Sequence, residues 1–290
     1  MTTIGVVIRT LNESELLGRC VETLRGQHGD FDLDILVVDS GSTDATVAIA
    51  RSHGCRIVEI APRDFDYSKA LNLGMAEARG DILVSLSAHA VPVEHGWLEC
   101  VVAAFDDPKV AGVSTRQVPW PGAPWQEVKR LREGFGETRH VYTLESAGDI
   151  LFSNAASAIR REAWVEHSFR LPAVEDVDWA RRVVAAGWSI VYEPGTAVYH
   201  SHRETPREQA RRMIDINRVH TSAAERTWRR TLREAAAFYR RDARSILGLE
   251  EPIRRRLAYL TELSATVVYY LADFSKAGST AERRRLDPSA

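Results

Sequence analysis

The sequence predicts an α/β fold: an open, mostly parallel twisted sheet flanked by helices, with a C-terminal helical extension. Two observations predict this fold. Short apolar runs rich in β-branched residues alternate with segments of helical periodicity through the first hundred residues. These runs show no regular polar alternation, as expected of parallel strands buried on both faces. Because four strand-and-helix units agree, we expect a parallel sheet covered by helices.

The expected elements follow one another closely. The first strands lie at 4–8, 35–38, 56–60 and 82–86, and the helices between them at 13–24, from Ser42 or Thr43 to His53, and at 68–78. A helix at 97–105 and a strand at 110–115 then lead into a loop rich in Pro and Trp at 118–125. An extended segment at 150–159, a helix at 176–186 and strands at 188–193 and 197–200 precede helices from Pro206 onward, with a break at 248–252.

Charge divides the chain into two parts, and we expect an α/β domain at 1–203 and a basic helical extension at 204–290. Residues 203–290 carry 19 Arg and Lys against 12 Asp and Glu, a net +7, whereas the remainder carries 19 against 28, a net −9. Interleaved apolar residues predict one apolar face on these helices, which would pack on the domain or on a second copy in a homodimer. The basic face is either solvated or in peripheral contact with the inner membrane surface.

Other features of the sequence favour a cytoplasmic protein. The segment MTTIGVVIRTLNE lacks the pattern of a signal peptide, and no stretch approaches the ~20 uninterrupted apolar residues that span a bilayer. The three cysteines are far apart in apolar surroundings, which is typical of buried thiols in a reducing compartment. No motif that reads nucleic acid is recognisable, so no nucleic-acid partner is expected.

Four expected strands end in loops at the sheet edge where open parallel sheets bind ligands, and three of these loops begin with polar or acidic residues. The four segments are 9–13, 39–42, 61–66 and 87–90. The first of them contains no Gly-x-Gly-x-x-Gly, and Gly-x-x-x-x-Gly-Lys-Ser/Thr occurs nowhere in the chain. A dinucleotide-dependent dehydrogenase and a P-loop NTPase are therefore disfavoured.

An ordered set of motifs resembles family 2 glycosyltransferases of the GT-A fold. The motifs are VIRTLNE at 7–13, VVDSGSTD at 37–44, KALNLG at 69–74, ARGDIL at 78–83 and AVEDVDW at 173–179. The segment VYHSH at 198–202 is similar to the bacterial rhamnosyltransferase branch. The resemblance extends over residues 3–218 and implies that 1–203 is a catalytic domain that binds a nucleotide sugar.

The resemblance implies a nucleotide site at the first strand ends. Asp39 would accept hydrogen bonds from a nucleobase, while other side chains close around base and ribose. Lys69 lies on a helix that would pass the diphosphate, so its ammonium group could offer a positive charge. Asn72, three residues on, shares its helical face. The nucleotide-binding set is Thr10, Asn12, Glu13, Asp39, Ser40, Lys69, Asn72, Ser87 and Ala88.

The segment Ser87-Ala88-His89 departs from the family pattern, which usually has Asp-x-Asp and a carboxylate that holds Mn²⁺ or Mg²⁺. Three interpretations follow: His89 ligates Mn²⁺, its imidazolium contacts the phosphate without a metal, or the site is an inactive remnant. His200 and His202 share one face of an expected strand and favour a metal site with His89. Imidazole binds Mn²⁺ but suits Mg²⁺ poorly, so Mn²⁺ is the expected cofactor.

Glu175 and Asp176 open an expected helix, and they are the candidate catalytic carboxylates. Asp176 matches the family's general base, which takes the proton of the acceptor hydroxyl as that hydroxyl attacks the anomeric carbon. Acidic residues in a first helical turn are equally common as helix caps. Ser153 and Asn154 resemble the loop that lines the donor-sugar pocket.

We therefore expect an inverting glycosyltransferase of hexosyltransferase type, which moves a sugar from a nucleotide diphosphate sugar to a hydroxyl. The acceptor is expected to be a carbohydrate or lipid-linked molecule in polysaccharide, glycolipid or glycoconjugate synthesis. The rhamnosyltransferase likeness makes dTDP-rhamnose the first candidate donor, followed by UDP- and GDP-sugars. Two alternatives remain: a catalytically silent nucleotide-sugar-binding protein, and a sugar nucleotidyltransferase, although the latter normally has a Gly-rich basic loop after its first strand.

Overall fold

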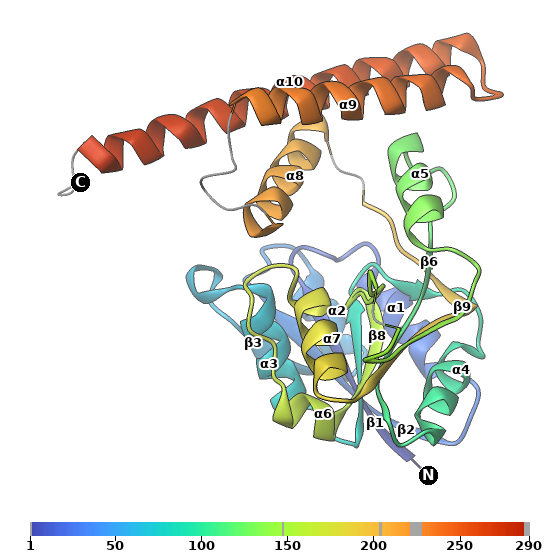
Figure 1. Ribbon diagram of the computed structural model, residues 1–290. Coiled ribbons are helices and arrows are strands. Elements are labelled where there is room, and N and C mark those ends of the chain that lie inside the picture. The colour runs from blue at the N-terminus through green and yellow to red at the C-terminus, as the bar shows by residue number, and fades with distance from the viewer. Residues whose placement is uncertain (1, 147, 203–204, 221–227, 287–290) are drawn as a thin grey trace. The chain divides into compact units, whose positions relative to one another are not determined.

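The computed structural model describes residues 2–146, 148–202, 205–220 and 228–286 of the chain (Figure 1). The chain separates into two compact units, Met1–His202 and Arg203–Ala290. The first unit contains the sheet and the helices that cover it, and the described part of the second unit is helical. Each unit has its own apolar core, so each is described by itself.

Within the described residues, the first unit forms a curled, mixed sheet of nine strands. One half is parallel: β1 (Thr2–Thr10) lies between β2 (Phe31–Asp39) and β4 (Ile82–Ser87), and β3 (Arg56–Glu59) lies beside β2. In the other half, β8 (Ala156–Arg160) runs antiparallel between β4 and β6 (Val110–Val118), and β6 is parallel to β9 (Ser189–Tyr199). The short β5 (Val91–Pro92) and β7 (His140–Tyr142) pair antiparallel with β9. The predicted fold class is confirmed.

Helices cover both faces of this sheet (Figure 1). One apolar cluster joins the sheet to α1 (Leu17–Arg25), α2 (Thr46–Ser52) and α4 (Trp97–Ala103). The other joins it to α3 (Tyr67–Glu77), α6 (Arg161–Glu166) and α7 (Glu175–Ala185). Successive residues of a strand point to opposite faces, so Val6 and Ile8 enter the first cluster and Val7 enters the second.

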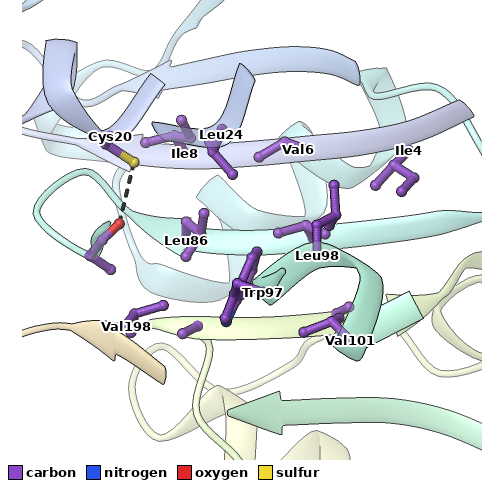
Figure 2. Close-up of a cluster of buried hydrophobic side chains, with 14 of the residues drawn as sticks. Ile4, Val6, Ile8, Cys20, Leu24, Leu86, Trp97, Leu98, Val101 and Val198 are labelled. Carbon is purple, nitrogen blue, oxygen red and sulfur yellow. Dashed lines mark hydrogen bonds between the residues drawn. The ribbon is translucent and has the colours of Figure 1, made fainter. Parts of the chain in front are cut away.

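Cys20 belongs to the first cluster, where Figure 2 shows it among Ile8, Leu24 and Leu86. Its thiol donates a hydrogen bond to the carbonyl oxygen of Ala90 at 3.3 Å. Burial raises the pKa of Cys20 to about 12, so the thiol stays neutral and acts as a packing group. The other two cysteines were also expected to be buried, but they are only half-buried.

Several expected elements have different bounds, for identifiable reasons. Helix α1 begins at Leu17 instead of residue 13, because 13–16 form a turn closed by a hydrogen bond from the Leu17 N–H to the Glu13 carbonyl. Helix α2 begins at Thr46, beyond the expected caps, because the Ser42 hydroxyl is engaged with Asp39 and with the N–H of Asn12. The two strands expected at 188–193 and 197–200 are one strand, β9.

Some short elements were not predicted from the local sequence pattern. The extended segment expected at 150–159 becomes a strand only at Ala156, and helix α5 (Trp125–Gly134) and strand β7 were not expected. In the second unit, α8 (Pro206–His220) and α9 (Trp228–Leu247) precede α10 (Ile253–Leu286), so the predicted break at 248–252 is confirmed. None of the described helices is both long and apolar enough to cross a bilayer.

Gly74 allows helix α3 to lie close against the sheet, which predicts a specific cost for a methyl group there. A Cβ at Gly74 would lie 2.4 Å from Cγ1 of Val7 and 2.9 Å from Cγ2 of Val38. We expect Gly74→Ala to lower the free energy of unfolding by about 1–3 kcal/mol, measured by urea denaturation. Gly134→Ala in α5 is the control, since its Cβ would meet no atom within 4 Å. Equal stabilities of the two variants would contradict this close packing.

Candidate active site

The C-terminal ends of β1 and β2 meet at Asp39, the expected nucleobase ligand. Asp39 is 3% exposed, and its carboxylate accepts hydrogen bonds from the N–H groups of Gly41 and Ser42 and from the hydroxyls of Ser42 and Thr10. These bonds occupy the roughly four acceptor positions of a carboxylate. A nucleobase that bonds to Asp39 therefore has to replace one of the two hydroxyls.

Asn12 and Ser40 fasten the turn after β2 to the end of β1. The Asn12 side-chain oxygen accepts a hydrogen bond from the Thr43 N–H at 2.8 Å, and the Ser40 hydroxyl donates to the Thr10 carbonyl at 2.9 Å. Asn12 has a φ of 56°, in the left-handed region that asparagine tolerates better than most residues. These two predicted nucleotide ligands thus shape the loop that would surround a base.

The three predicted metal ligands come together as a histidine cluster: His89 after β4, and His200 and His202 after β9. Their ligand-capable atoms lie within 4.8 Å of one another. Nδ1 of His89 is 2.7 Å from Oε1 of Glu13, and Nδ1 of His200 is 2.7 Å from Oε1 of Gln117. Nε2 of His89 faces Nε2 of His200 at 3.1 Å. Glu13, expected to contact the nucleotide, contacts His89 in this structure.

The hydrogen bonds of His89 and His200 determine which ring nitrogens could bind a cation. Each Nδ1 faces an oxygen acceptor and so carries the N–H, which leaves a lone pair on each Nε2. Burial, followed by the neighbouring His89 and His202, holds the pKa of His200 well below its ordinary 6.5, so His200 is neutral. Two lone pairs at 3.1 Å repel each other unless a proton or a metal ion bridges the two Nε2 atoms.

The separation of the two Nε2 atoms also fits the metal interpretation. Two nitrogens about 2.1 Å from one ion are about 3 Å apart when they subtend a right angle at it. Glu13 and Gln117 occupy the position of the outer hydrogen-bond partners that normally orient histidine ligands of metals. The cluster thus has the donor atoms and the supporting contacts that a nitrogen-liganded ion requires.

The predicted catalytic carboxylates open helix α7. Val174, which precedes them, has a φ of 59°, a strained conformation for a β-branched residue. The Asn154 N–H donates to Asp176 and its side-chain amide donates to Glu175, both at 3.3 Å. Burial raises the pKa of Asp176, while burial and then the Asp176 charge raise the pKa of Glu175, against an opposing effect of Arg9 on both.

Hydrogen bonds connect the histidine cluster to the segment that holds these carboxylates. Gln117 of β6 accepts from Nδ1 of His200 and donates its amide to the Ser153 hydroxyl at 3.0 Å. Ser153 adjoins Asn154, which bonds to both carboxylates. The two residues expected in the sugar pocket therefore stand between the cluster and Asp176.

Four more of the predicted nucleotide ligands make contacts within the protein. Asn72 accepts hydrogen bonds from the Trp164 indole and the Phe169 N–H and donates to the Phe169 carbonyl, so its amide fastens α3 to the loop after α6. Lys69 is exposed, and its Nζ lies 3.2 Å from Oδ2 of Asp66. Ser87 and Ala88 each donate a backbone N–H, to the carbonyls of Ala155 and Arg9, and thereby hold the strand end that presents His89.

Sequence reasoning missed several residues that shape this site. Gln117 is 2% exposed at the end of an otherwise buried strand, and that polar interruption was the available signal. Glu127 of the unexpected helix α5 is 1% exposed and accepts the His202 N–H at 3.3 Å. Trp120 donates its indole N–H to the His89 carbonyl at 3.3 Å. Arg9 lies in the VIRTLNE motif at 7–13, but the sequence alone predicted no function for it.

Comparison with known proteins decides the family. Residues 5–166, more than half of the chain, match the family described as Glycosyl transferase family 2. The chain belongs to this family. As a family 2 glycosyltransferase, it transfers a sugar from a nucleotide sugar.

Named relatives of this family 2 chain include a rhamnosyltransferase and a further glycosyltransferase. The O-antigen chain rhamnosyltransferase RfbN of Salmonella typhimurium is 28% identical over 227 residues, which cover 75% of this chain and 72% of RfbN. The pre-mycofactocin glycosyltransferase of Mycobacterium tuberculosis is 29% identical over 224 residues, which cover 71% of this chain and 44% of that protein.

Solved structures agree with the fold. The mannosyltransferase PcManGT from Pyrobaculum calidifontis, in complex with GDP-Man and Mn²⁺, aligns with a TM-score of 0.54 at 18% identity, over 96% of this chain and 75% of that one. TarS 1–349 from S. aureus aligns with a TM-score of 0.53 at 16% identity, over 90% and 70%. At these identities the likeness supports the fold alone.

The neutral state of His200 predicts a pH dependence of stability. Its pKa is depressed in the folded protein, so below about pH 6.5 the unfolded chain binds the extra proton and stability falls as the pH drops. One such group contributes up to about 1.4 kcal/mol per pH unit. We expect His200→Gln to remove this contribution in urea unfolding from pH 7 to pH 5 with EDTA, and exposed His140→Gln to retain it. An unchanged slope in His200→Gln would refute the assignment.

Proposed function

We propose that this family 2 enzyme is an inverting transferase in which Asp176 is the general base, with dTDP-rhamnose as the first candidate donor. The observation that carries the proposal is the hydrogen-bonded connection from the histidine cluster through Gln117 and Ser153-Asn154 to Asp176. This connection joins the histidine cluster, which could bind the diphosphate or its metal ion, with the Asp176 carboxylate, which could accept a proton. Both are needed when a hydroxyl displaces a nucleotide.

The chemistry assigned to Asp176 follows from its surroundings. The acceptor oxygen would attack the anomeric carbon while its proton passes to the Asp176 carboxylate, and the bond from the sugar to the diphosphate breaks with its electron pair. Burial raises the pKa of Asp176, which makes its ionised form a stronger base. Asn154 donates to one carboxylate oxygen and so orients the group. Inversion follows when attack and departure lie on opposite faces of the sugar.

The donor and the acceptor are assigned by likeness. RfbN and WbaN are named O-antigen chain rhamnosyltransferases and are 28% and 29% identical to this chain. A saccharide hydroxyl, free or lipid-linked, is accordingly the proposed acceptor. The catalytically silent alternative has less support, because it gives no reason for a strained helix start that presents a buried Glu175 and a half-buried Asp176, both with raised pKa values.

Asp176 can be tested against a close neighbour. We expect Asp176→Asn to lower kcat about 10²- to 10⁴-fold, because the hydroxyl loses its proton acceptor, while the affinity for nucleoside diphosphate stays unchanged. The measurement is nucleoside diphosphate release during transfer, with affinity from calorimetry. Asp178→Asn is the matched control, since Asp178 lies in the same helical turn and pairs with Arg182 at 2.8 Å. Full activity in Asp176→Asn would exclude it as the base.

We further propose that His89, His200 and His202 hold a divalent ion, Mn²⁺ in preference to Mg²⁺, because all three ligands are imidazoles. Such an ion would neutralise charge on the departing diphosphate. The protein's part is to hold the rings through Glu13 and Gln117 and to keep His200 neutral.

Thermal unfolding tests the metal. We expect Mn²⁺ with nucleoside diphosphate to raise Tm by several degrees more than Mg²⁺ does, because bound ligand stabilises the folded state. His202→Gln should remove the Mn²⁺ increment, and exposed His140→Gln should not. Equal stabilisation by nucleotide in EDTA and in Mn²⁺ would refute the metal while leaving the transferase proposal in place.

A further inference from the structure

Arg9 lies near the C-terminal end of β1, beside the proposed catalytic carboxylates, yet much of its hydrogen-bonding capacity is unused. Its side chain is 14% exposed. The Nε and Nη1 atoms are buried and have no hydrogen-bond partner among the residues that the structure describes. The Tyr67 ring covers the guanidinium at 5.0 Å from the ring centroid, a cation–π distance that limits its movement.

Among the described residues, Arg9 is paired with the carboxylate of Glu175, and this pair does not satisfy the guanidinium. Oε1 of Glu175 is 3.6 Å from Nη1, too far for a hydrogen bond. Oε1 also accepts a hydrogen bond from the Asn154 side-chain amide at 3.3 Å. A guanidinium stays charged at every pH at which proteins fold, and buried charges are normally both paired and hydrogen-bonded. Arg9 therefore lacks an anion.

The position of Arg9 indicates which anion this is. Arg9 pairs with Ser87 of β4, two residues before His89, and its Nη1 lies 3.6 Å from Oε1 of Glu175, the chain neighbour of Asp176, so it lies near both halves of the site. In a transfer reaction, the bond that breaks lies between the general base and the groups that receive the leaving phosphate. An oxyanion beside Arg9 would thus be adjacent to the reacting carbon.

We propose that Arg9 binds the diphosphate of the sugar-nucleotide donor, with the N–H groups of Nε and Nη1 as donors to its oxygens. This inference rests on the proposed function. Charge-assisted bonds of this kind are stronger than neutral ones. When the bond to the sugar breaks, the diphosphate takes the electron pair and becomes more negative. A fixed guanidinium stabilises that charge without reorganising, so its effect is greater in the transition state.

The test compares a nucleoside diphosphate with its own nucleoside by calorimetry, using whichever of dTDP, UDP and GDP binds the wild type most tightly. Arg9→Lys keeps the charge but cannot reproduce the donor geometry. We expect it to weaken diphosphate binding about tenfold, as the loss of one charge-assisted bond does, and to leave nucleoside binding unchanged. Arg63→Lys, at an arginine whose side chain is 87% exposed, should change neither affinity.

A second variant guards against misfolding of the first. Tyr67→Leu removes the ring over the guanidinium at a position that is 47% exposed, and it should weaken diphosphate binding about threefold with nucleoside binding intact. If Arg9 only pairs with Glu175, Arg9→Lys will lower Tm while the ratio of the two affinities stays at the wild-type value, which overturns this inference alone. A wild type that binds neither compound overturns the proposed function as well.

Discussion

The hydrogen bonds of Gln117 are the contacts on which the rest of the site depends. Gln117 belongs to β6, which pairs with β8 on one side and with β9 on the other. Ser153 and Asn154 precede β8, and His200 and His202 follow β9. The Gln117 amide bonds to both of those segments, at Ser153 and at His200. A slip of one residue in β6 would turn this side chain to the opposite face of the sheet. Sheet register therefore determines whether the histidine cluster and Asp176 are connected.

Conformational strain is concentrated beside the same groups. Within the described residues, Asn12 and Val174 are the non-glycine residues with positive φ, and each precedes a site carboxylate, Glu13 or Glu175. A left-handed β-branched residue costs of order 1–3 kcal/mol, which the surrounding packing must offset. The apolar cluster around Leu71 and Trp179 lies under both α3 and α7 and supplies such packing. The core thus stabilises a helix start that local preferences disfavour.

This chain has Ser87-Ala88-His89, with no carboxylate, where the family usually has Asp-x-Asp. A carboxylate at that position would add negative charge near the diphosphate and require a cation. Here the position is His89, and a neutral His200 faces it at 3.1 Å. The proposed ion and the guanidinium of Arg9 would then share the neutralisation of the leaving group, with fewer anionic ligands competing for them. Glu175 and Asp176 stay close to this positive charge while burial raises their pKa values.

The sequence by itself determined the fold class, the family resemblance and the three histidines, because strand periodicity and motif order are local and survive without knowledge of contacts. It could not determine that Glu13 would orient His89, that the Asn72 amide would be used by the loop after α6, or that Gln117 and Arg9 belong to the site. Those outcomes depend on pairs more than 75 residues apart. Only the tertiary structure, through strand register and helix placement, decided which of these polar groups contact one another and which hold neighbouring segments together.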